Sequence, residues 1–135
     1  MRRIGQNLKV KMQNYNSKFK TDLIGRCFNL SLRVIKICDQ LPKKRSAWVI
    51  ADQLIRATCS IGANLTEAKA ASSRLEFKRF YEIALKSANE AGYWLMLLSK
   101  SSLADEKIVG DLTRELTEIS NMIASGVLRL KGKKF

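Results

Sequence analysis

The sequence contains no histidine, one proline and three cysteines among 135 residues. Without histidine, the chain lacks the most frequent general base and the imidazole ligand of many zinc sites. It has no CxxC pair and no carboxylate at the Glu-x-x-His spacing, so Cys27, Cys38 and Cys59 are interpreted as buried thiols in a reducing cytosol. We therefore predict a non-enzymatic protein with no catalytic residue, no bound metal and no cofactor.

Long apolar runs are also missing. The arginines at the start are not followed by the apolar segment of a signal peptide, and no run is long enough to span a bilayer. The N-terminal arm has few large apolar residues and would anchor only weakly to a membrane surface. These features predict a cytoplasmic protein without a membrane partner, and the length allows a single domain.

Acidic residues are scarce where positive charge gathers. Lys and Arg number 25 against 12 Asp and Glu, which gives a formal net charge of +13. Residues 1–20 hold six cations and residues 119–135 hold four, with no anion in either segment. Basic ends on a nearly balanced body suggest arms for a phosphate backbone. The alternative interpretation is that the ends are solvated and only keep the protein soluble.

Apolar residues recur at spacings of three and four along four segments, which is typical of helices in a bundle. The segments cover about residues 19–40, 45–70, 73–100 and 105–130, and the first ends at the Leu41-Pro42 step. Short connections between long helices favour antiparallel neighbours. We predict an all-α, antiparallel up-and-down four-helix bundle over residues 19–130, a partly ordered basic arm at 1–18 and a basic tail at 131–135.

A second set of apolar residues lies beside the main stripes. Two interpretations remain open, a broad core or a surface shared between subunits. The set consists of Ile24, Phe28, Ile35, Trp48, Ile55, Phe80 and Trp94.

Polar residues form a further stripe on the second and third helices. Arg56 and Glu90 are expected to meet where these helices cross, as a charged pair that fixes register. A general acid–base pair is the functional alternative, but no nucleophile accompanies it. We interpret five residues as structural polar positions: Gln53, Arg56, Asn64, Glu67 and Glu90.

The run from Gln53 to Glu67, QLIRATCSIGANLTE, resembles the Q-L-x-R-A-x-x-S-I-x-A-N-x-x-E signature of a four-helix-bundle family. That family was first named for reading frames in 23S ribosomal RNA intervening sequences, and the resemblance covers about residues 22–130. Ala68 stands where the family usually has glycine, so the second helix is expected to run a turn longer here.

The resemblance implies an assembly and a partner class. Members of the family form homopentamers, so a homo-oligomer is expected. The family is similar to the accessory variability protein of diversity-generating retroelements, a basic pentamer that binds nucleic acid and a reverse transcriptase. RNA or DNA and a reverse transcriptase are therefore the partners that the resemblance implies.

The up-and-down topology predicts where nucleic acid would touch. It brings both chain ends and the second-to-third connection to one end of the bundle, and the first-to-second connection to the other. The predicted phosphate-binding cations are Arg2, Arg3, Lys9, Lys11, Lys18, Lys20, Arg74, Lys78, Arg79, Arg129, Lys131, Lys133 and Lys134. Lys43, Lys44 and Arg45 would form a secondary patch at the opposite end.

Phosphate neutralisation is expected, rather than base reading, because no RNA-recognition aromatic motif or zinc finger is present. Tyr15, Phe19 and Phe135 are interpreted as packing residues, with base stacking as the alternative. The leading prediction is a nucleic-acid-binding oligomeric scaffold or accessory protein. The alternative is a protein–protein adaptor without a nucleic-acid ligand.

Overall fold

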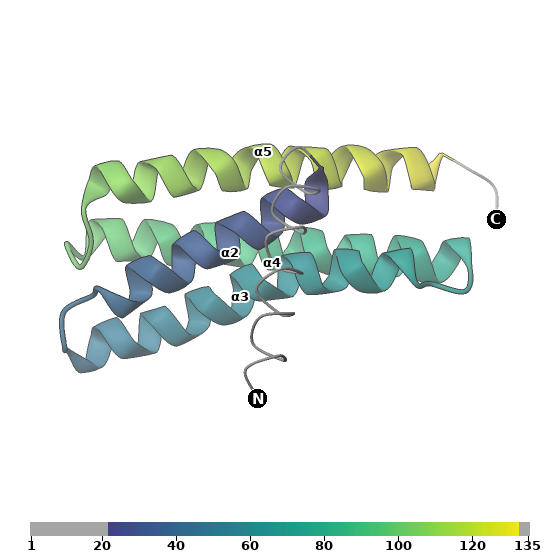
Figure 1. Cartoon of the computed structure of the whole chain (residues 1–135). Coiled ribbons are helices and arrows are strands. Elements are labelled where there is room, and N and C mark those ends of the chain that lie inside the picture. The colour runs from purple at the N-terminus through teal and green to yellow at the C-terminus, as the bar shows by residue number, and fades with distance from the viewer. Residues whose placement is uncertain (1–21, 133–135) are drawn as a thin grey trace, which may run out of the picture.

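A computed structural model describes residues 22–132 of the chain, and these residues form four α-helices. The helices are α2 (Leu23–Asp39), α3 (Arg45–Lys69), α4 (Arg74–Lys100) and α5 (Glu106–Lys131). They form an antiparallel bundle, so the predicted fold class is confirmed (Figure 1). The predicted arm at 1–18 and most of the tail at 131–135 lie outside the described residues.

Local sequence signals set the helix starts. Asp22 caps α2 by accepting a hydrogen bond from the Gly25 amide at 2.7 Å, and Ser73 caps α4 by accepting from the Glu76 amide at 3.1 Å. Asp105 caps α5 through the Lys107 amide at 2.8 Å. Helix α3 continues through Ala68, where the family usually has glycine, and ends at Lys69 with Ala70 as its C-cap.

The core consists of one apolar face from each helix, and it includes Leu30, Leu54, Leu95 and Ile119 as fully buried side chains. Three small residues of α4 are also buried in this core: Ala84, Ala88 and Ala91. On α5 the apolar residues Leu112, Leu116, Ile119 and Ile123 are buried in this core. Val109 and Val127 are buried, whereas Ile108 is 45% exposed.

Helix α2 has 17 residues, whereas the other three have 25 to 27. At 1.5 Å per residue it is about 12–15 Å shorter than the other three helices. Figure 1 shows that α2 spans only part of the bundle's length and begins well short of the end where α5 finishes. That end is therefore built by α3, α4 and α5 alone within residues 22–132.

Arg26 ties this short helix to α5. Its guanidinium contacts the carboxylates of Glu115 and Glu118, and Nε donates to Glu115 Oε1 at 3.1 Å. Both carboxylates raise the pKa of Arg26, so the guanidinium stays charged. Helix periodicity did not reveal this contact, because the partners lie far apart in the sequence.

Candidate nucleic-acid interface

The antiparallel arrangement places the start of α4 and the end of α5 at one end of the bundle (Figure 1). Arg74 and Arg79 are exposed in the first two turns of α4, and Arg129 and Lys131 are exposed in the last turn of α5. We call these four residues the basic end. The predicted convergence of these two groups of cations is therefore found in the structure.

Lys78, the fifth described cation of the predicted site, is less available. Its side chain is 22% exposed, and Nζ lies 4.0 Å from the Glu82 carboxylate one turn later. Glu76 also lies in the first turn of α4, where it accepts a hydrogen bond from the Ser72 hydroxyl at 2.8 Å. These two acids partly offset the positive charge of the basic end.

The cations at the start of α4 interact unfavourably with the helix dipole. The first turns of a helix expose amide groups and a partial positive charge, which favours acidic rather than basic side chains. Arg74, Lys78 and Arg79 therefore strengthen the attraction of that terminus for an anion instead of stabilising the helix.

The secondary patch lies at the opposite end, as predicted. Lys43, Lys44 and Arg45 are exposed beside the connection between α2 and α3. Lys100 and Lys107 lie at the same end, because the α4–α5 connection is also there, and neither belongs to the predicted patch. Asp39, Asp105 and Glu106 accompany these cations.

The two ends of the described bundle thus carry comparable numbers of exposed cations. Most of the excess positive charge belongs to residues outside the described range: Arg2, Arg3, Lys9, Lys11, Lys18, Lys20, Lys133 and Lys134. The asymmetry of the predicted interface depends on these eight residues, which lie beyond residues 22–132.

The expected contact between Arg56 and Glu90 is not formed. Both side chains are exposed, and no ion pair joins them among the ion pairs of residues 22–132. The helices instead meet through two hydroxyls, since Ser60 Oγ and Ser87 Oγ are 2.9 Å apart. Arg56 and Glu90 lie about one helical turn from Ser60 and Ser87, respectively, and both charged side chains are exposed to solvent.

The other three structural polar positions differ in burial. Asn64 is half-buried and donates to the Ser60 carbonyl at 2.8 Å and to Ser60 Oγ at 3.0 Å, so it belongs to the hydroxyl contact. Gln53 is half-buried and Glu67 is exposed. In the polar stripe, Asn64 thus belongs to the contact between the helices, whereas the charged residues Arg56, Glu67 and Glu90 are exposed.

The thiols differ in burial. Cys27 is buried, and burial raises its pKa to about 12, whereas Cys38 and Cys59 are half-buried. Burial also raises the pKa of Cys38, to about 11. In residues 22–132, no three His, Cys, Asp or Glu side chains are grouped as a metal site would require. None of the helices in that range has the length and apolar character needed to cross a membrane.

These observations define a class of protein: an all-helical bundle with exposed cations at both ends and a polar α3–α4 contact. Residues 20–125 match the profile of the 23S rRNA-intervening sequence protein family, and the chain belongs to that family. This confirms the resemblance seen in the Gln53–Glu67 run. None of the curated proteins compared with the chain matches it.

A solved structure is also similar. It is a Bacteroides thetaiotaomicron protein of unknown function, assigned to the S23 ribosomal protein family. The two chains are 30% identical and superpose with a TM-score of 0.73. The similarity covers 78% of this chain and 97% of the other, so nearly the whole Bacteroides protein corresponds to the bundle.

Proposed function

We propose that this protein is a non-catalytic oligomeric scaffold that binds RNA or DNA mainly through phosphate contacts. The observation that carries the proposal is the net charge of +13, to which exposed cations at both ends of the described bundle contribute. Arg74, Arg79, Arg129 and Lys131 form the end that we propose as the phosphate-binding site. Phosphate neutralisation by such side chains supplies most non-specific affinity for nucleic acid. Family membership supports the proposal through the link of the family's name to ribosomal RNA.

Salt dependence tests the electrostatic part. If about six phosphates are neutralised, the logarithm of the duplex affinity falls with the logarithm of salt concentration at a slope near −5. Gel shift or fluorescence anisotropy at several salt concentrations measures this slope. Affinity that does not change with salt contradicts the proposal, as does the absence of binding at low salt.

Charge removal tests the location. The variant Arg74→Ser/Arg79→Ser/Arg129→Ser removes three cations from the basic end, and Lys43→Ser/Lys44→Ser/Arg45→Ser removes three from the other. We expect the first variant to lose more affinity than its matched control. Deleting residues 1–18 and 131–135 is expected to lower affinity by about tenfold or more while helicity is retained. Equal losses in the two triple variants would contradict the location.

Exposed apolar side chains support the oligomer. Trp48, Tyr93 and Met96 are each at least 60% exposed in the single chain. Contiguous exposed apolar surfaces mark interaction sites in soluble proteins, and we propose that these side chains contribute to such a surface between subunits. The family resemblance implies a homopentamer, and light scattering on the purified protein measures the subunit number. A monomer at all concentrations would contradict this part of the proposal.

A second candidate function is favoured by an apolar groove between α2 and α3. It has a volume of about 300 Å³, and Phe28, Leu32 and Ile35 lie along it beside Cys59. An apolar groove can receive the apolar face of a helix from a partner protein, including the reverse transcriptase that the resemblance implies. Pull-down before and after nuclease treatment separates the two functions, because a partner bridged by nucleic acid is lost after digestion.

A further inference from the structure

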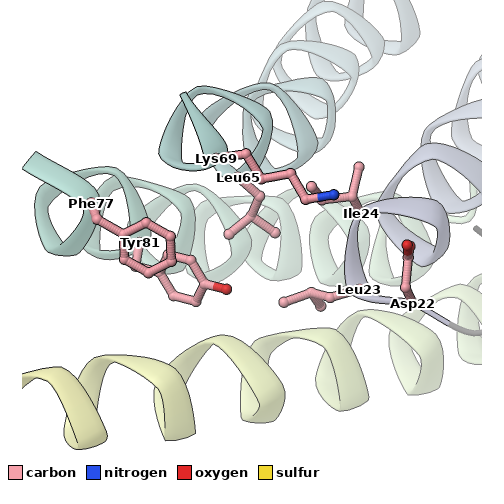
Figure 2. A pocket seen from close by; sticks show the side chains of 7 residues that line it. All are labelled: Asp22, Leu23, Ile24, Leu65, Lys69, Phe77 and Tyr81. Atoms are coloured by element: carbon pink, nitrogen blue, oxygen red, sulfur yellow. The ribbon is translucent and has the colours of Figure 1, made fainter. Parts of the chain in front are cut away.

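The short α2 leaves a groove at the end of the bundle. Asp22 and the first residues of α2 form one side, the last turns of α3 form the second, and the start of α4 forms the third (Figure 2). The groove has a volume of about 400 Å³. Its walls are mostly apolar, with Leu23, Ile24 and Leu65 beside two aromatic rings.

The two rings belong to Phe77 and Tyr81 on successive turns of α4. They are stacked, with centroids 4.8 Å apart and planes inclined by 25°. Figure 2 shows the rings overlapping on one side of the groove, with the Tyr81 hydroxyl directed toward Leu23. Both side chains are half-buried, so part of the aromatic surface stays accessible.

Helix α5 supports this stacked pair from behind. Gly126 lies so close to Tyr81 that an added Cβ would be 2.7 Å from its Cε2 atom. Burial raises the pKa of Tyr81, while the nearby positive charge of Arg129 acts in the opposite direction. The ring is therefore held in place, with a cationic side chain near it.

Cations border the groove. Lys69 lines it, and Figure 2 shows its side chain extended above Leu65 toward Ile24. A smaller hollow on the other side of the same two rings, of about 180 Å³, is lined by Arg129 and Leu130. Stacked aromatic rings between positive charges are complementary to a flat base joined to phosphates, because bases stack on aromatic side chains while cations follow the backbone.

We propose that this groove binds one unpaired base of a single-stranded nucleic acid. The base contacts Phe77 and Tyr81, and the neighbouring phosphates contact Lys69 and Arg129. This inference rests on the proposed function and adds to it a preference for single strands. A lipid chain or a second copy of the protein would fill the apolar walls but would not use the cations in this way.

The test compares a single-stranded oligonucleotide with a duplex of the same number of phosphates, using the full-length protein. Tyr81→Leu and Phe77→Leu keep apolar volume but remove the ring. Each is expected to lower single-strand affinity by about five- to 140-fold and to leave duplex affinity unchanged. Tyr81→Phe is the matched control, because it keeps the aromatic ring and removes only the hydroxyl, so it should retain single-strand affinity.

Crosslinking of the unaltered protein provides a second measurement, which does not depend on how the variants fold. An oligonucleotide containing 4-thiothymidine is irradiated in the complex, and the crosslinked peptide is identified by mass spectrometry. We expect it to contain Phe77 or Tyr81. Crosslinks confined to the terminal segments or to the opposite end would overturn the inference.

The outcomes separate the two proposals. If single strands and duplexes bind equally and Tyr81→Leu changes neither affinity, the groove does not take a base, although the phosphate-binding function stands. The inference also fails if Tyr81→Leu lowers only thermal stability, as expected when another part of the chain fills the groove. If neither nucleic acid binds, both proposals fail.

Discussion

Replacing Gly126 by alanine tests the contact between α5 and Tyr81. The added Cβ would lie 2.7 Å from Tyr81 Cε2 and 3.0 Å from Cδ2, closer than carbon atoms normally approach. Overpacking of this kind costs about 1–3 kcal/mol. Alanine also gains about 0.5–1 kcal/mol over glycine within a helix. We therefore expect a net loss in the free energy of unfolding of roughly 0.5–2 kcal/mol.

Gly110 provides a matched control in the same helix. A Cβ added there meets no atom within 4 Å, so Gly110→Ala is expected to gain about 0.5–1 kcal/mol. Urea and thermal unfolding followed by circular dichroism measure both variants. For a chain of this size the Tm of Gly126→Ala is expected to fall by roughly 2–8 °C, while that of Gly110→Ala rises.

The double variant Tyr81→Leu/Gly126→Ala isolates the cause of the loss. Once the ring is removed, the alanine has space, and its penalty relative to Tyr81→Leu is expected to disappear. A Tm for Gly126→Ala equal to or above that of Gly110→Ala would refute the reasoning. So would an undiminished penalty in the absence of the ring.

Three further predictions concern the core and the helix contacts. Burial raises the pKa of the Cys27 thiol from its ordinary value of 9.0 to about 12. The stability that the buried neutral thiol contributes is therefore present below pH 9 and is lost as the pH rises toward 12. In urea unfolding, the free energy of unfolding should fall more steeply with pH in the wild type than in Cys27→Ala. A double-mutant cycle of Arg26→Met and Glu115→Gln should give a coupling of about 1 kcal/mol that weakens in high salt, and zero coupling at low salt would contradict it. Ser87→Ala should cost about 1 kcal/mol by leaving the Ser60 hydroxyl with one partner fewer, whereas adding Ser60→Ala should recover part of that loss, as urea unfolding can show.

The helix limits could be predicted because they depend on neighbouring residues. Ser73 caps α4 where the sequence places a capping serine three residues before Glu76, and Asp105 caps α5 in the same local way. Leu41-Pro42 ends the first segment, with α2 stopping at Asp39. Each of these signals acts within one helical turn and needs no tertiary contact.

The rotation of a helix about its axis was harder to predict. Ile108 and Val109 are adjacent apolar residues, so spacing alone does not decide which one faces the core, and Val109 is the buried one. The same limit explains the error for Arg56 and Glu90. A small difference in rotation moves both charges to the outer edge and brings Ser60 and Ser87 together.

The candidate sites depended on tertiary structure to different degrees. Up-and-down topology was enough to bring Arg74 and Arg79 to the same end as Arg129. The groove lined by Phe77 and Tyr81 was not predicted, because it depends on where α2 begins and on the closeness of Gly126 to Tyr81. The one sequence signal for this contact was Gly126, which lies inside the predicted fourth helix and has no side chain to keep a ring away.

The unequal helix lengths also affect how the bundle opens. Helix α2 has the least length over which to pack, and Arg26 provides its ion pairs to α5 among the described residues. Regions with fewer packed contacts unfold locally at a lower free energy than the global transition. Amide hydrogens of α2 should therefore exchange before those of α3 and α4, and each such opening exposes the core side of Leu30 and Val34 while the other three helices remain paired.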